Sequence, residues 1–162
     1  MLQLLGNSLL VLLTLVQQSG LPRFEDHAVQ LRFRGKPALV NLRSDPGAPM
    51  YRTVLRKGAA KGPNFADHFT IVTWGCGSNC QRFAIVDARS GRVKMISQYA
   101  SNGLLFRRSS ALLIADPIRE SDMQQYDNAL PEWLVTRYFL WDGKSLVQID
   151  SSRSATPADA LR

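Results

Sequence analysis

The feature that most constrains the fold of this chain is a series of turn signals between short runs rich in β-branched and aromatic residues. Asp142-Gly143 lies between two such runs within residues 134–150, which is a strong signal for a β-hairpin. Residues 68–74 and 82–88 flank a glycine-rich turn, and residues 103–116 hold two runs around an Arg-Ser-Ser turn. The chain is therefore predicted to be an all-β meander of antiparallel hairpins, arranged as a sandwich, an open barrel or blade-like sheets.

Three other segments give less regular signals. Residues 29–34 alternate apolar and polar side chains and are followed by Gly35-Lys36, which predicts one more hairpin. The stretch from Tyr51 to Leu55 fits either a short strand or a helical turn. One short helix is predicted near residues 118–130, ahead of Pro131.

The length of 162 residues fits one domain of ordinary size. We assign residues 21–150 to a single β-rich domain. Residues 151–162 contain few apolar side chains to bury, so they are expected to form a flexible tail.

Residues 1–20 carry no charged side chain, and their apolar run from Leu9 to Val16 is too short to span about 30 Å of hydrocarbon as a helix. This pattern fits a secretory signal peptide, so the protein is expected to be periplasmic or secreted after cleavage. A buried N-terminal helix is the alternative interpretation. An uncleaved anchor fits less well, because polar residues interrupt the segment before Leu9.

The chain is basic, with 20 Lys and Arg against 13 Asp and Glu, a formal net charge of +7 and a pI near 9.9. Such a surface favours acidic proteins, anionic envelope polymers or, at the periphery of a membrane, lipid headgroups. Nucleic acid is not expected as a partner, because the chain is predicted to be exported and has no Lys/Arg run longer than two residues. A scattered basic surface that only supports solubility is the alternative.

Cys76 and Cys80 are the two cysteines of the chain, and they enclose Gly77-Ser78-Asn79 between two strand-like runs. A disulfide requires Cα atoms about 4.4–6.8 Å apart, so the chain must turn sharply between them. Glycine, serine and asparagine favour such a turn. We therefore predict a structural disulfide at a hairpin tip, worth about 2 kcal/mol by loop closure.

Other chemistry for the cysteines is less well supported. Zinc sites usually need three or four ligands, and His68 is expected about 20 Å along the strand from Cys76. No metal site and no cofactor is predicted, and no catalytic residue is assigned. An enzyme that uses Cys76 and His68 as a reactive pair remains an alternative hypothesis. The usual redox-active spacing is C-x-x-C before a helix, which differs from this turn.

Four residues around the turn are candidates for ligand or partner binding: His68, Trp74, Asn79 and Asn64. One interpretation places His68, Trp74 and Asn79 in a common ligand-facing cluster. The other gives His68 a hydrogen bond with Asp67 or a carbonyl, and makes Trp74 a lid on the core. Asn64 is expected at a loop end, where its side chain makes local turn bonds.

Residues 64–93, NFADHFTIVTWGCGSNCQRFAIVDARSGRV, resemble a family of bacterial exported proteins to which no reaction is assigned. The shared features are N-F-A-x-H-aromatic, an apolar strand, W-G-C-G-x-x-C-Q and an apolar-Asp-x-x-[ST]-G turn. The later LLFRRSSALLIADP and TRYFLWDGKSLVQI resemble the following strands of that family. Asp67 stands where the family usually has a small residue, often glycine. The resemblance implies export and a β-rich fold.

The combined prediction is a non-catalytic periplasmic binding protein. Its ligand is expected to be an envelope polymer or a protein partner of the inhibitor or immunity type. Two alternatives remain: an envelope enzyme with the Cys76/His68 pair, and a structural subunit of an envelope complex that offers an open sheet edge to partner strands.

Overall fold

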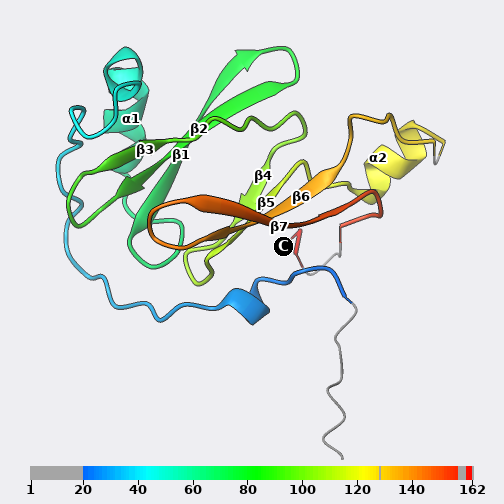
Figure 1. Ribbon diagram of the computed structural model, residues 1–162, viewed down its shortest axis with the longest axis horizontal. Coiled ribbons are helices and arrows are strands. Elements are labelled where there is room, and N and C mark those ends of the chain that lie inside the picture. The colour runs from blue at the N-terminus through cyan, green and yellow to red at the C-terminus, as the bar shows by residue number, and fades with distance from the viewer. Residues whose placement is uncertain (1–19, 128, 157–159, 162) are drawn as a thin grey trace, which may run out of the picture.

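The computed structural model describes residues 20–127, 129–156 and 160–161 and shows a mainly β protein (Figure 1). The predicted signal peptide, residues 1–20, lies almost entirely outside the described residues. In chain order the elements are η1 (Glu25–His27), η2 (Ala48–Tyr51), α1 (Arg52–Ala59), β1 (Phe69–Gly77), β2 (Cys80–Asp87), β3 (Val93–Met95), β4 (Leu104–Phe106), β5 (Leu112–Ala115), α2 (Glu120–Gln125), β6 (Thr136–Trp141) and β7 (Leu146–Ser152).

The strands form two antiparallel sheets in sequence order, β1-β2-β3 and β4-β5-β6-β7 (Figure 1). The first hairpin pairs Phe69 with Asp87 at one end and Gly77 with Cys80 at its tip. The last hairpin pairs Trp141 with Leu146 around the turn that contains Asp142-Gly143. The predicted meander of antiparallel hairpins is confirmed, because its turn residues and strand residues are local in sequence.

The two sheets pack face to face through every second residue of β1, β2, β5 and β6, as the two-residue period of a β-strand requires. This arrangement is a sandwich with a core of aromatic and branched side chains. The strand residues in this core are Phe69, Ile71, Phe83, Ile85, Leu113, Ala115, Phe139 and Trp141.

Each sheet is also covered on its outer face. On the first sheet, Val72 and Val86 pack under α1, whose Leu55 and Ala59 are buried against them. Gly58 permits this close contact, since a Cβ atom there would lie 2.5 Å from the Val72 side chain. On the second sheet, Leu112, Ile114 and Tyr138 pack against Phe24 and Ala160 from the two ends of the described chain. A strand buried on both faces, such as β5, therefore reads as a continuous apolar run.

One segment differs from the sequence predictions. Residues 29–34 do not form a hairpin: their region contains only an isolated bridge between Ala28 and Ser110. Alternation predicted strand pairing, but the donors of this segment bond to turns elsewhere, for example Val29 N–H to the Ser109 carbonyl. The Tyr51–Leu55 region is helical and begins α1, while α2 lies inside the range predicted for the short helix.

The end of the chain is partly packed. β7 runs to Ser152, two residues beyond the predicted domain boundary, and Thr156 is buried. The Thr156 N–H donates to the Ile118 carbonyl at 2.7 Å, and its hydroxyl accepts from the Ile118 N–H at 3.0 Å. The flexibility expected for residues 151–162 stays a prediction.

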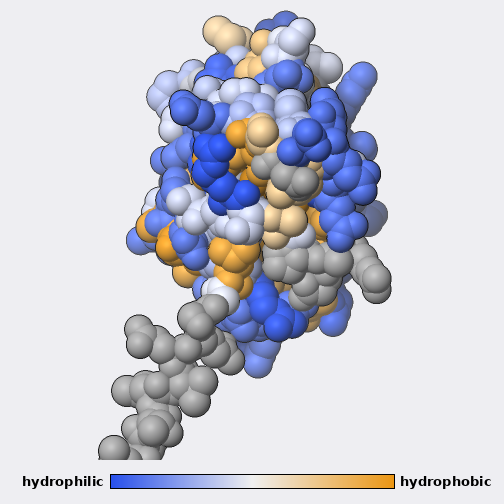
Figure 2. Space-filling view, turned by 90° about the vertical axis from the view of Figure 1, so that its right-hand side faces the viewer, coloured by the Kyte–Doolittle hydropathy of each residue, from blue (hydrophilic) through white to orange (hydrophobic). Residues whose placement is uncertain are grey.

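The face on the right-hand side of Figure 1 shows only small apolar patches. Figure 2 views it from the right-hand side of Figure 1, and the visible hydrophobic residues form small patches between hydrophilic ones. Small scattered patches are normal on a soluble surface and do not call for a partner.

Gly91 fixes the loop after β2 against the irregular segment that precedes α1. Its φ is +72°, and a Cβ atom there would lie 1.9 Å from the Leu39 carbonyl oxygen. The Asn41 N–H donates to the Gly91 carbonyl at 2.8 Å, so the two backbones run in direct contact. Only glycine adopts this left-handed backbone easily and also lacks the side chain that would collide with Leu39.

We expect Gly91→Ala to destabilise the protein by about 3 kcal/mol or more, because the new methyl group forces the two backbones apart. Gly143→Ala is the matched control, since Gly143 also has a positive φ of +95° but open space around its Cβ position. The control should lose only about 1 kcal/mol. Urea unfolding measures both, and equal losses would show that the Leu39 contact does not matter.

Candidate functional site

The turn before β1 is built on two consecutive residues with left-handed backbone, Ala66 (φ +41°) and Asp67 (φ +68°). Aspartate tolerates this conformation better than most residues, though less well than glycine. The Asp67 N–H donates to the Arg108 carbonyl at 2.8 Å, which ties this turn to the turn between β4 and β5. Asp67 thus occupies a tight turn at the position where the resembling family often has glycine.

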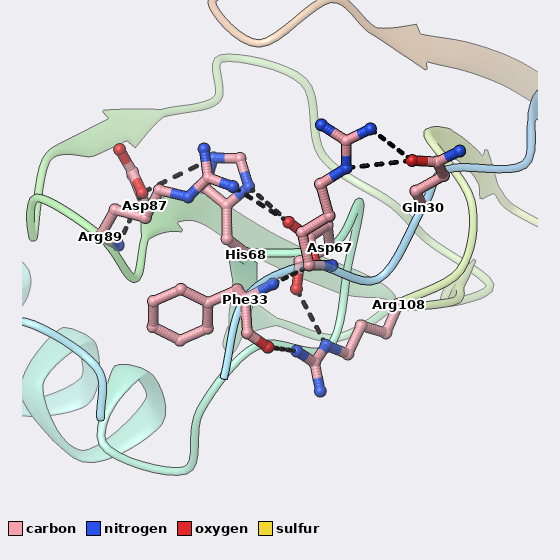
Figure 3. Close-up of polar contacts among 8 residues, drawn as sticks. Gln30, Phe33, Asp67, His68, Asp87, Arg89 and Arg108 are labelled. Atoms are coloured by element: carbon pink, nitrogen blue, oxygen red, sulfur yellow. Dashed lines mark hydrogen bonds and ion pairs between the residues drawn. The ribbon is translucent and has the colours of Figure 1, made fainter. Parts of the chain in front are cut away.

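The Asp67 carboxylate is a buried junction between three parts of the chain; the residue is only 6% exposed (Figure 3). One oxygen accepts from the Arg32 and Phe33 backbone N–H groups at 2.7 and 2.9 Å. The other oxygen lies 3.2 Å from an Arg89 guanidinium nitrogen and 3.3 Å from His68 Nδ1. This group therefore ties the lead-in segment, residues 28–34, to the turns at the end of the first sheet.

Opposing effects act on the pKa of the Asp67 carboxyl. Burial by itself would raise it, but the N–H donors of Phe33 and Arg32 and the contact with His68 outweigh burial and lower the pKa below the usual 3.8. The carboxylate form is therefore the one that the fold stabilises.

Arg108 closes the same junction from the second sheet (Figure 3). Its Nε donates to the Asp67 carbonyl at 2.9 Å, and a terminal nitrogen donates to the Phe33 carbonyl at 2.6 Å. One guanidinium thus bridges the lead-in segment and the turn before β1, which suits its rigid fork of donors.

His68 lies between two carboxylates at the start of β1 (Figure 3). Its Nδ1 is 3.3 Å from Asp67, its Nε2 is 3.8 Å from an Asp87 oxygen, and its ring stacks obliquely on Phe69 at 4.2 Å. The side chain is 18% exposed. The predicted bond between His68 and Asp67 is therefore present.

A cleft of about 620 Å³ opens beside this histidine, between the first sheet and the β6–β7 turn. Phe69, Ile85 and Trp141 form its apolar floor, with the rings of Phe69 and Trp141 edge-to-face at 5.3 Å. The polar lining comes from Ser44, Asp45, Asp87, Arg92, Lys94 and Lys144. Its size lies in the range typical of small-ligand sites.

The acidic side chains of this cleft are hydrogen-bonded, whereas its basic side chains are exposed. Asp87 accepts from Arg89 N–H at 2.8 Å and from the Ser90 hydroxyl at 2.7 Å, and Asp45 accepts from the Met95 and Gly47 N–H groups. Arg92, Lys94 and Lys144 are exposed and form no ion pair among the described residues. Three cations therefore outnumber two carboxylates around the apolar floor, and Lys144 also interacts with the neighbouring Asp142.

Three segments far apart in the sequence meet at this cleft. Phe69 belongs to NFADHF, Asp87 and Arg92 belong to VDARSGRV, and Trp141 and Lys144 belong to YFLWDGKS. The W-G-C-G-x-x-C-Q segment lies elsewhere, at the tip of the first hairpin.

The other predicted site residues do not join His68. Asn79 has φ +51° and lies in the hairpin tip, at the opposite end of β1. Trp74 packs on Tyr51 with ring centroids 4.6 Å apart and contributes to the core under α1, as a lid would. Asn64 donates to the Ile71 carbonyl and accepts from the Ile71 N–H, so its side chain extends the edge of β1.

Cys76 and Cys80 form the predicted disulfide, with Cα atoms 5.1 Å apart. No cysteine is left free, and the hairpin register separates the disulfide from His68 by the length of β1. The alternative Cys76/His68 pair is not assembled in this structure.

Sequence reasoning missed Asp67 as a junction and missed the cations of the cleft. The signal for Asp67 was a carboxylate at a position suited to glycine, which points to a left-handed turn. Arg92, Lys94 and Lys144 follow turn residues and resemble ordinary solvated positions, so only their meeting in space distinguishes them.

No family model, curated protein or solved structure matches the chain. Among the described residues, no group of three or more His, Cys, Asp or Glu side chains is placed to hold a metal ion. Within the same residues, no helix is long and apolar enough to cross a membrane.

Replacing the Asp67 carboxylate should have a pH-dependent effect on stability. Because its folded pKa is below the unfolded value of 3.8, its stabilisation is complete above that value and is lost as the pH falls through the folded pKa. We expect Asp67→Asn to cost about 1–3 kcal/mol at neutral pH and clearly less at about pH 3. Urea unfolding at both pH values measures this, with the exposed Asp150→Asn as control; a loss independent of pH would contradict it.

Removing the disulfide should affect stability without affecting the cleft. We expect Cys76→Ser/Cys80→Ser to lose about 2 kcal/mol, because only a short loop is released. The native protein should show no free thiol on titration under denaturing conditions. Two titratable thiols in the protein isolated from its natural compartment would favour the Cys76/His68 hypothesis instead.

Proposed function

We propose that this protein is a non-catalytic exported binding protein whose cleft takes the anionic groups of an envelope polymer. The observation that carries the proposal is the set of three exposed cations, Arg92, Lys94 and Lys144, which outnumber the two carboxylates of the lining and surround a floor of Phe69 and Trp141. Cations around a concave apolar surface attract an anionic ligand and retain its less polar face.

The chemistry of the rim favours carboxylate-bearing sugars. Lysine offers a mobile point charge and arginine a planar fork, and both bind carboxylates. Of the floor residues, Phe69 and Trp141 keep a small exposed area, 9% and 6%, that the ring of a sugar could contact. The cleft is open at its side, which suits a polymer segment more than a small closed ligand.

The compartment agrees with this proposal. The Cys76–Cys80 disulfide is compatible with an oxidising periplasmic or extracellular location. Residues 1–20 predict a signal peptide, which would deliver the chain there.

The structural alternative would rely on a different surface. Ser44 and Asp45 accept from the Val93 and Met95 N–H groups and so cover the outer edge of β3. β7 is an edge strand with Val147 and Ile149 exposed, and a partner strand would have to use that edge, β4 or β1.

The test uses oligogalacturonate of defined length, with a neutral cellodextrin of equal length as comparison. Calorimetric titration at low salt should show binding of the acidic oligosaccharide alone, weakening as salt rises. We expect Lys94→Gln/Lys144→Gln to bind roughly tenfold more weakly.

Arg56→Gln/Lys57→Gln removes the same charge from α1, outside the cleft, and should bind as the unmodified protein does. Equal weakening by both double variants would reduce the effect to net charge and reject the cleft as the site. If an acidic glutamate peptide binds through Lys94 and Lys144 and the oligosaccharide does not, the site belongs to a protein partner instead.

A further inference from the structure

The net positive charge of the protein is concentrated in one segment. Residues 28–61 hold eight Lys and Arg and a single acidic residue, Asp45, which leaves twelve basic and twelve acidic residues in the rest of the chain. All eight basic side chains are exposed, and none forms an ion pair among the described residues. They are Arg32, Arg34, Lys36, Arg43, Arg52, Arg56, Lys57 and Lys61.

Most of the segment gathers at one end of the molecule. In Figure 1, α1 and the cyan stretch before it lie beside the β1-β2-β3 sheet, away from α2, while the blue stretch runs below the second sheet. Residues 36–40 line a shallow apolar groove together with Arg56, Ala59 and Ala60 of α1, so loop and helix share one surface. The loop is fixed there, since the Ala38 N–H donates to the Ala88 carbonyl at 2.8 Å.

The same segment carries the two most exposed large hydrophobic side chains among the described residues. Leu39 is 93% exposed in the loop, and Met50 is 81% exposed directly before α1. A leucine held almost fully in water by a backbone-anchored loop gains no burial from the fold itself. An apolar side chain beside several cations is the combination that membrane-surface segments use.

We propose that this basic surface docks on an anionic lipid bilayer. Arg52, Arg56 and Lys57 would lie on the headgroups, while Leu39 and Met50 enter the boundary with the acyl chains. The proposal goes beyond the ligand cleft and does not depend on it. A soluble polyanion or a nucleic acid would engage the cations but would gain nothing from the two apolar side chains.

The experiment is co-sedimentation of the purified full chain with vesicles. Vesicles of phosphatidylglycerol mixed with phosphatidylcholine should bind the protein. Pure phosphatidylcholine vesicles should bind it with an affinity lower by roughly tenfold or more. Arg56→Gln/Lys57→Gln should weaken binding to the anionic vesicles by roughly tenfold or more. Leu39→Ser/Met50→Ser, which leaves every charge in place, should weaken it by roughly tenfold.

The matched control is Lys94→Gln/Lys144→Gln, which removes the same charge from the cleft and should retain vesicle binding. Residues 1–19 are common to all variants, so a difference between variants belongs to the exchanged side chains. Equal binding to neutral vesicles, or full binding by Leu39→Ser/Met50→Ser, would overturn bilayer docking. A duplex DNA that binds with the same loss on Arg56→Gln/Lys57→Gln, while vesicles do not bind, would assign the surface to nucleic acid.

The variants Arg56→Gln/Lys57→Gln and Lys94→Gln/Lys144→Gln also separate this inference from the proposed function. If the cleft is the ligand site and α1 the docking surface, each variant loses one activity and retains the other. Circular dichroism spectra and unfolding midpoints close to those of the unmodified protein would exclude misfolding as the cause, since all four exchanged side chains are exposed.

Discussion

Buried carboxylates in left-handed turns attach the irregular parts of this molecule to its two sheets. Asp67 accepts from two consecutive N–H groups of the lead-in segment and contacts one guanidinium. Asp116, with φ +56°, does the same on the second sheet: it accepts from the Ser101 and Asn102 N–H groups and pairs with Arg137. In both places a charged acceptor satisfies backbone donors that no strand could reach, which is why long segments without a ladder can still be ordered.

The difference between local strand pairing and long-range side-chain bonds also decides what could be predicted from the sequence. The hairpins were predictable because strand, turn and return strand are adjacent, as in the pairing of Trp141 with Leu146. The Asp67 bond to Arg32 crosses 35 residues, and no local pattern indicates it. Residues 29–34 show the consequence: alternation predicted a hairpin, but the N–H groups of Arg32 and Phe33 bond to Asp67 instead.

The candidate site was predictable in part for a related reason. The motif around His68 predicted a candidate residue at the N-terminal end of β1, beside which the cleft opens. The bond between His68 and Asp67 follows from their adjacency in the sequence. Trp74 and Asn79 are close to His68 in sequence but lie along or beyond the same strand, so extended geometry separates them. Arg92 and Lys94 come from the start of β3, and Lys144 comes from the β6–β7 turn, so they meet only when the sheets pack.

The cleft and the basic surface are linked through the segment that precedes α1. Asp45 lines the cleft and is held by the Met95 N–H, and Met50 follows five residues later at the start of the docking surface. Between them, η2 is short and anchored by the buried Ala48. A rigid connection of this kind fixes the orientation of the cleft relative to whatever the basic surface contacts. A protein docked on a bilayer would then hold its ligand at a constant distance from the lipid, which is the arrangement that a polymer lying next to the membrane requires.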